Sequence, residues 1–208
     1  MNTRSRCTRA TLGVIFAAIL FLQGCAETVI AVGAGAAVMS VTDRRSTGAQ
    51  VDDEGIELRV ANRIDERFGD KVHVNVTSFN YVVLLTGEVP DAGTRAELDK
   101  IARGAPGVRS VANETQIAGV SSFGARTNDS YITSKVKARF LDVGHFNPIH
   151  VKVVTEASVV YLMGIVTEAE AKEAVEIART TGGVLKVVKI FEYCAVGQAP
   201  CKASEKTS

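Results

Sequence analysis

Hydrophobic residues recur along this chain in two kinds of spacing. A spacing of four predicts a helix with one apolar face, and two sets follow it: Ile56, Val60 and Ile64, then Ile132, Val136 and Phe140. Alternating apolar residues after each helix, from Val72 and again from Ile149, predict half-buried strands. A more continuous apolar run follows at 81–85 and at 159–163, which is typical of a buried strand.

These elements are two copies of one unit. Residues 74–89 match residues 151–166 when the chain is shifted by 77, and flanking segments match at a shift of 76. Each unit reads α-β-β-α-β, and the second helix of the second copy begins with a capping-box pattern at Thr167 and Glu170. A right-handed crossover then gives a mixed three-stranded sheet covered by two helices on one face, an α+β fold.

The repeat and its flanks predict six segments. They are a signal peptide at 1–24, a lipidated Cys with a membrane-proximal linker at 25–53, a first domain at 54–118, a linker at 119–126, a second domain at 127–193, and a tail at 194–208. Units this small bury modest cores, so the two domains are expected to pack on one another.

The N-terminus has the pattern of a bacterial lipoprotein signal. Arg4, Arg6 and Arg9 precede an apolar run, residues 12–22, about half the roughly 20 residues that a membrane span needs. The run ends in Leu-Gln-Gly-Cys, which resembles a lipobox and makes Cys25 the lipidation site. The alternative is a plain secretory signal that leaves Cys25 a free thiol. Ala26 follows, rather than the Asp that usually retains lipoproteins in the inner membrane, so we expect the outer membrane.

Composition narrows the function classes. The net charge is +1, and removal of the three signal-peptide arginines lowers it to about −2, which argues against a nucleic-acid partner. No Gly-x-Ser-x-Gly elbow, P-loop, His-Glu-x-x-His or paired Cys-x-x-Cys is present, so we expect neither an enzyme nor a cofactor. His73 and His150 occupy equivalent places in the repeat, which favours a role in the fold over a catalytic pair.

Two cysteines remain near the C-terminus. Cys194 and Cys201 flank a short loop and are candidates for a disulfide in an oxidising compartment. Two free thiols are the alternative. A metal site is disfavoured because no second Cys or His pair completes it.

The first helix of the second unit carries a surface that its counterpart lacks. Tyr131, Lys135 and Arg139 are spaced i, i+4, i+8 and share one stripe, and Tyr131 falls where the first unit has Gly55. An aromatic with basic neighbours suits an anionic membrane interface. Because the first unit also has arginines at 59 and 63, a solvated helix face is the competing interpretation.

The repeated unit resembles the BON domain, a module of bacterial envelope and osmotic-shock proteins. The resemblance is carried by the Val-x-Val strands, the strands that end in Gly87 and Gly164, the Ile-Ala-Arg of the second helices, and the Gly-Val before the last strands. Further motifs resemble outer-membrane lipoproteins with two BON domains: the lipobox, Gln50-Val51-Asp52-Asp53, Asn128-Asp129, Ile132-Thr133 and Leu162-Met163-Gly164.

This resemblance implies a non-enzymatic, periplasm-facing outer-membrane lipoprotein. It implies binding of anionic phospholipid, notably phosphatidylglycerol, through Tyr131, Ile132, Lys135 and Arg139, and support of outer-membrane integrity at division sites. The related proteins carry Trp at the place of Tyr131, so lipid affinity is expected to be weaker here. The alternative function is a protein-interaction adaptor for envelope assembly factors or proteases, without direct lipid recognition.

Overall fold

A computed structural model describes residues 43–143 and 147–201. The predicted lipidation site, Cys25, lies outside the described residues. Within the described residues, no helix is both long and apolar enough to cross a membrane.

The first domain follows the predicted order of elements. It consists of α3 (Thr47–Phe68), a short 3-10 helix (Gly69–Lys71), β1 (His73–Phe79), β2 (Val82–Val89), α4 (Ala92–Arg103), β3 (Ser110–Asn113) and β4 (Gln116–Ile117). The structure divides the predicted last strand, 108–117, into β3 and β4, and both pair with β2.

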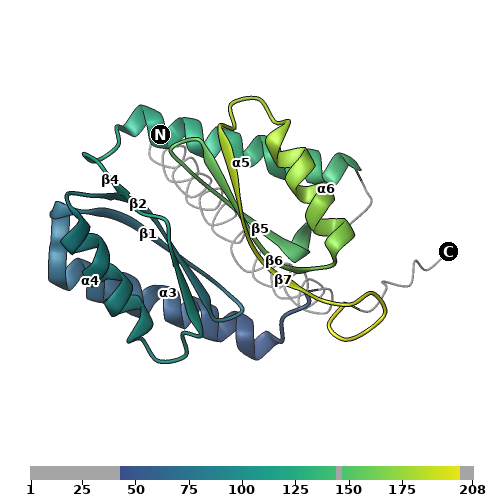
Figure 1. The fold of residues 1–208 in the computed structure, drawn as a ribbon, viewed down its shortest axis with the longest axis horizontal. Coiled ribbons are helices and arrows are strands. Elements are labelled where there is room, and N and C mark those ends of the chain that lie inside the picture. Colours follow the sequence, from purple (N-terminus) through teal and green to yellow (C-terminus); the bar gives the residue numbers. More distant parts are fainter. Residues whose placement is uncertain (1–42, 144–146, 202–208) are drawn as a thin grey trace, which may run out of the picture. The chain divides into compact units, whose positions relative to one another are not determined.

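The second domain repeats this order. It consists of α5 (Phe123–Val143), a 3-10 helix (Pro148–His150), β5 (Val151–Glu156), β6 (Val159–Val166), α6 (Glu168–Arg179) and β7 (Lys186–Tyr193). In each domain the first two strands are antiparallel and the last runs parallel to the middle strand. Figure 1 shows both helices of a domain on the same face of its sheet. The predicted α+β fold is therefore confirmed.

The apolar stripes of the helices form the two cores. Ile56, Val60 and Ile64 of α3 pack with residues of β2 and α4. Their counterparts in α5 are Ile132, Val136 and Phe140, which pack with residues of β5, β6 and α6. All six side chains are buried, as the spacing of four predicted. The Thr167–Glu170 capping box at the start of α6 is also present.

A buried aspartate fixes the hairpin turn of each domain. Both central residues of each two-residue turn have positive φ, a conformation that residues other than Gly seldom adopt. Asp53 on α3 accepts hydrogen bonds from the backbone N–H groups of Asn80 and Tyr81, at 2.7 and 2.8 Å. In the second domain Asp129 does the same for Ala157 and Ser158, at 2.9 and 2.8 Å. The helix thereby holds the hairpin in a strained turn.

Gly87 and Gly164 lie inside β2 and β6 and not at the strand ends that the sequence predicted, and close backbone contact requires a glycine at both places. A Cβ atom on Gly87 would collide with the carbonyl oxygen of His73, and one on Gly164 with that of His150. Gly87 also has a φ of +110°. Both strands continue for two residues beyond these glycines, so the absence of a side chain serves the close packing of each hairpin.

Three predicted segment boundaries need correction. The segment 43–53 is not a linker, because α3 begins at Thr47, Ser46 caps it, and Asp53 is buried against the first hairpin. Likewise α5 begins at Phe123, within the predicted linker 119–126. Within the predicted tail, Cys201 is buried and its carbonyl oxygen accepts a hydrogen bond from the backbone N–H of Gly197 at 3.0 Å. The polar composition of these segments suggested loops, but capping and hydrogen bonds place them in the domains.

A third apolar cluster joins the two sheets on the faces that the helices leave open. Phe79 and Leu84 of the first sheet pack with Tyr161, Met163 and Ile165 of the second, and Cys201 completes the buried set. Polar contacts also join the two domains. Lys152 Nζ lies 2.8 Å from Glu57 Oε1, and Asn80 donates to Glu192 at 2.9 Å. The expected packing of the two domains on one another is thus present.

Candidate membrane-binding surface

Helix α5 presents an exposed face that combines apolar and basic side chains. Since successive helical residues are about 100° apart, Tyr131 shares its side of the helix with residues three, seven and ten positions later. We define the α5 face as these exposed residues and the two lysines that flank them: Tyr131, Ser134, Ala138 and Leu141, with Lys135 and Lys137. Tyr131 is 63% exposed and Leu141 is 72% exposed.

Tyr131 and Lys135 contact each other on this face. Lys135 Nζ lies 4.6 Å from the centre of the Tyr131 ring, within the range of a cation–π interaction. The same ammonium donates a hydrogen bond to the carbonyl oxygen of Gly182, in the loop before β7. Leu185 in that loop is 82% exposed. The tyrosine is therefore held by a neighbouring cation, with a second exposed apolar residue in the adjoining loop.

The other two predicted lipid-binding residues are placed differently. Ile132 is fully buried in the core of the second domain, so the prediction that it contacts lipid is wrong. Arg139 is half-buried, and its guanidinium donates to the Ile177 carbonyl oxygen and to Thr181 Oγ1, both at 2.8 Å. Its side chain therefore links α5 to the end of α6.

The first domain shows how much of the basic stripe belongs to the fold. Arg59, at the place of Lys135, donates to the carbonyl oxygen of Pro106 at 3.3 Å. Arg63, at the place of Arg139, donates to that of Gly104 at 3.3 Å. Basic residues at these positions close the loop before the last strand in both domains. What distinguishes α5 is that Tyr131 and Leu141 are exposed apolar residues where α3 has Gly55 and Asp65.

Leu141 and Lys137 were missed in the sequence because the stripe was followed at steps of four. Steps of three and seven from Tyr131 lead to Ser134, Ala138 and Leu141 instead. The signal was available in the repeat, where Leu141 falls at the place of Asp65. Because this position faces solvent, the leucine in place of an aspartate does not serve the core and indicates a surface contact.

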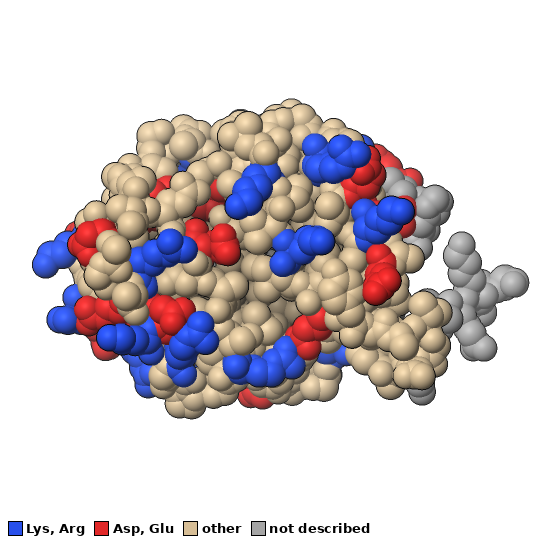
Figure 2. All heavy atoms as spheres, in the orientation of Figure 1, with Lys and Arg blue, Asp and Glu red and all other residues tan. Residues whose placement is uncertain are grey.

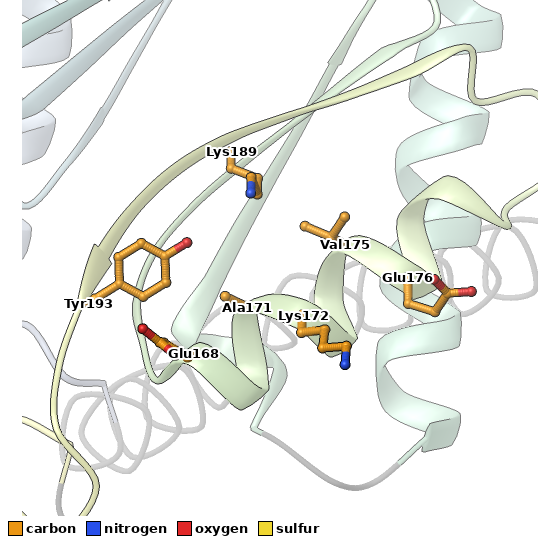
Figure 3. A pocket seen from close by; sticks show the side chains of 7 residues that line it. All are labelled: Glu168, Ala171, Lys172, Val175, Glu176, Lys189 and Tyr193. Atoms are coloured by element: carbon orange, nitrogen blue, oxygen red, sulfur yellow. The ribbon is translucent and has the colours of Figure 1, made fainter.

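Helix α6 presents a surface of different character. A groove of about 360 Å³ lies between α6 and β7 and is lined by Glu168, Ala171, Lys172, Val175, Glu176, Lys189 and Tyr193 (Figure 3). Carboxylates and ammonium groups share this groove around a small apolar floor. The same mixture extends over the face in Figure 2, where basic and acidic side chains are interspersed. The groove offers a contact surface rather than a converging set of catalytic groups.

The remaining predicted residues have clear positions. Cys194 and Cys201 are joined as a disulfide, with Cα atoms 5.9 Å apart, a normal separation for such a bond. His73 Nδ1 lies 3.0 Å from Glu88 Oε2, and His150 Nδ1 lies 3.8 Å from Glu170 Oε1. Each histidine thus approaches a carboxylate of its own domain.

Comparison with known proteins assigns the class to which this fold belongs. The BON domain model matches residues 52–119 and 128–195, which are the two structural domains with most of α3 and α5. The chain therefore belongs to the BON domain family.

The relatives extend this assignment along the chain. The chain is 39% identical to the outer membrane lipoprotein DolP of Haemophilus influenzae, over 88% of this chain and 95% of that protein. It is 37% identical to the 21 kDa hemolysin of Actinobacillus pleuropneumoniae, over 73% and 79%. It is 32% identical to osmotically-inducible protein Y of Escherichia coli, over 67% and 72%. The similarity to DolP supports an outer-membrane lipoprotein with two BON domains, and none of the three relatives is named as an enzyme.

Proposed function

We propose that this protein is anchored by a lipid on Cys25, faces the periplasm, and binds anionic phospholipid through the α5 face. In this proposal it supports outer-membrane integrity, notably at division sites. The observation that carries the lipid-binding step is the exposure of Tyr131 and Leu141 on one side of α5, between two lysines.

The chemistry of the α5 face suits a membrane interface. Aromatic rings with a polar end are enriched at the level of the headgroups, and an apolar side chain beside them can enter the acyl boundary. Each lysine near an anionic surface contributes about 1 kcal/mol of attraction. Glutamates of α6, among them Glu168 and Glu176, are repelled by the same surface, so the domain has a preferred orientation on it.

The lipid anchor and the α5 face have different roles in the proposal. Several acyl chains on Cys25 give long residence at the membrane, since each buried methylene contributes about 0.8 kcal/mol. The α5 face adds a preference for anionic lipid. Replacement of Cys25 by Ser should abolish incorporation of labelled palmitate and release the protein from the membrane fraction. Labelling that persists would refute the assignment of Cys25.

Flotation with liposomes tests the α5 face separately from the anchor. The fragment of residues 43–208 should float with vesicles that contain phosphatidylglycerol and not with neutral phosphatidylcholine vesicles. Tyr131→Glu and Leu141→Glu should each abolish flotation, because both place a carboxylate at the anionic surface. Higher salt should weaken binding of the unchanged fragment.

The first domain supplies the matched control. Leu58 lies on the equivalent helix and is 65% exposed, so Leu58→Glu makes the same chemical change outside the α5 face. We expect this variant to float like the unchanged fragment. Equal binding to both kinds of vesicle, or full binding by Tyr131→Glu, would contradict the proposal.

A second candidate function is a protein-interaction adaptor for assembly factors or proteases of the envelope. The groove beside β7 favours it, because β7 is the last strand of its sheet in the described part of the chain. An extended segment of a partner could add to such an edge. A partner cross-linked in cells to Lys189, and still captured by Tyr131→Glu, would support the adaptor.

A further inference from the structure

A histidine and two glutamates meet where the two domains contact each other. His73 begins β1 and lies directly across the hairpin from Glu88 on β2. Glu156 is the last residue of β5 in the second domain. One ligand atom from each of the three side chains lies within 4.8 Å of the other two, in the part of the chain that the structure describes.

Both carboxylates of this cluster are buried and accept few hydrogen bonds. Glu88 is 6% exposed and Glu156 is 4% exposed. Glu156 accepts one hydrogen bond from Asn75 Nδ2, at 2.7 Å. Glu88 accepts from the Ser121 backbone N–H at 3.2 Å and contacts His73. Within the described ranges, neither carboxylate forms an ion pair with a lysine or an arginine.

The buried carboxylates of Glu88 and Glu156 carry like charges within 4.8 Å and repel each other. Burial raises the pKa of Glu156, the hydrogen bond from Asn75 lowers it, and the negative charge of Glu88 raises it again. A buried carboxylate without a cation is unfavourable, and natural proteins usually pair it or use it to coordinate a metal. Among the described residues, the basic group that contacts Glu88 is His73, and an imidazole is itself a common metal ligand.

We propose that His73, Glu88 and Glu156 bind a divalent transition-metal ion, with Zn²⁺ as the best chemical match, and that the ion links the two domains. Zn²⁺ accepts imidazole nitrogen and carboxylate oxygen, each at about 2.0–2.2 Å. Ligand atoms on a tetrahedral ion are about 3.4 Å apart, so small side-chain rotations from the present positions suffice. Three protein ligands leave the fourth position to water.

The surroundings match what a metal site needs. Asn75 holds Glu156 and the Ser121 backbone holds Glu88, as outer-shell partners orient metal ligands elsewhere. A pocket of about 380 Å³ lined by His73, Asn75 and Glu156 opens beside the cluster and gives an ion a way in.

The second domain does not repeat this cluster within the described residues, and the sequence repeat shows why. His150 is the counterpart of His73, but the counterpart of Glu88 is Ile165. The carboxylate near His150 belongs to Glu170, which is already paired with the guanidinium of Arg44 at 2.7 Å. The second domain therefore has a histidine at the same place but an isoleucine where the first domain has Glu88.

Zinc titration of the full chain tests the proposal. Untagged protein in detergent, stripped with a chelator and dialysed, should bind one Zn²⁺ per chain by calorimetry and metal analysis. Its unfolding temperature should rise with the Zn²⁺ concentration, because the ion binds the folded state. Asn75→Ala, which frees Glu156, should weaken binding roughly 10–100-fold.

Substitution of a proposed metal ligand should reduce the Zn²⁺ affinity more than Asn75→Ala does. Glu156→Gln and His73→Gln should each weaken binding by at least about 100-fold, the upper end of the effect of an outer-shell change. Glu156→Gln also removes a buried charge, so without metal it should unfold no earlier than the unchanged protein. Loss of binding then cannot be ascribed to misfolding.

Glu57→Gln is the matched control. It removes a carboxylate at the same domain contact, where Glu57 meets Lys152, but leaves the three ligands in place. This variant should bind Zn²⁺ as tightly as the unchanged chain. Absence of stoichiometric binding, or equal binding by Glu156→Gln, would overturn the proposal. Neither result would bear on lipid binding by the α5 face.

Discussion

The two domains use the same internal contacts and present different surfaces. Asp53 and Asp129 hold equivalent hairpin turns, and Arg59 and Lys135 close equivalent loops. On the exposed side of the first helix, however, Gly55 in one domain corresponds to Tyr131 in the other. A duplicated fold therefore separates the residues that every copy needs from those that one copy has acquired.

The same comparison identifies a second specialised place, on the first domain. Glu88 lies beside His73, whereas the second domain has Ile165 at that position. In the second domain Arg44 instead neutralises the glutamate nearest its histidine. The two copies thus differ at separate places: the second domain has an apolar helix face, and the first has a buried carboxylate beside its histidine.

The strongest test of the shared contacts is removal of the turn-binding aspartates. Asp53→Ala should reduce the free energy of unfolding by about 3–5 kcal/mol, because Ser78, Arg45 and two backbone N–H groups lose a buried charged partner. Asp129→Ala removes two backbone contacts and should cost about 2–3 kcal/mol. Urea unfolding followed by circular dichroism measures both losses.

The neighbouring aspartate is the control for this pair. Asp52 accepts one exposed hydrogen bond from the Tyr81 hydroxyl, so Asp52→Ala should change stability by no more than about 0.5 kcal/mol. Equal effects of Asp52→Ala and Asp53→Ala would show that the turn does not depend on the buried carboxylate.

A smaller difference is expected at the start of the second helix of each domain. Burial opposes the charge of Glu170, but hydrogen bonds from Arg44 and Thr167 and the charge of Arg44 lower its pKa to about 2. Glu170→Gln should cost about 2 kcal/mol at neutral pH, because the part-buried guanidinium of Arg44 loses its charged partner, while the amide oxygen can still complete the capping box. Asp91→Asn, at the helix start in the first domain, keeps an acceptor for Thr94 and should cost less.

The pH dependence of the stability that Glu170 contributes follows from the direction in which its pKa is shifted. Since the folded pKa of Glu170 is below its ordinary value of 4.5, its stabilising effect is present above about pH 4.5 and is lost as the pH falls through about 2. The unfolding curves of Glu170→Gln and the unchanged protein should converge over that range. A stability difference that persists at pH 2 would exclude the ionised carboxylate as its cause.

The smallest expected effect comes from exchanging residues of the α5 face with their counterparts on α3. Tyr131→Gly should weaken binding to phosphatidylglycerol vesicles about tenfold, equivalent to about 1.4 kcal/mol. Adding Gly55→Tyr to that variant should not restore binding, because Asp65 stands where the α5 face has Leu141. The chain with both Gly55→Tyr and Asp65→Leu is the informative comparison in flotation. Restoration by Gly55→Tyr alone would mean that one exposed aromatic is sufficient.

Local pattern and repetition were enough to predict the fold. The spacing of four predicted the buried residues of α3 and α5, and the offset of 77 predicted that the two hairpins are equivalent. Predicted boundaries failed where polar residues are engaged in tertiary contacts. Asp53 was assigned to a linker because the segment around it is polar. It is buried because it binds the first hairpin turn, which lies 28 residues further along the chain and could not be linked to it by local pattern.

What the sequence determined by itself was the repeated α-β-β-α-β unit, since hydrophobic periodicity is a local property of the chain. Only the tertiary structure decided which polar and apolar residues share a surface. Leu141 joins Tyr131 because helical rotation brings them to one side of α5, and Ile132 leaves that surface because it points into the core. Glu156 reaches His73 and Glu88 because the two sheets pack face to face, which no spacing along the chain encodes.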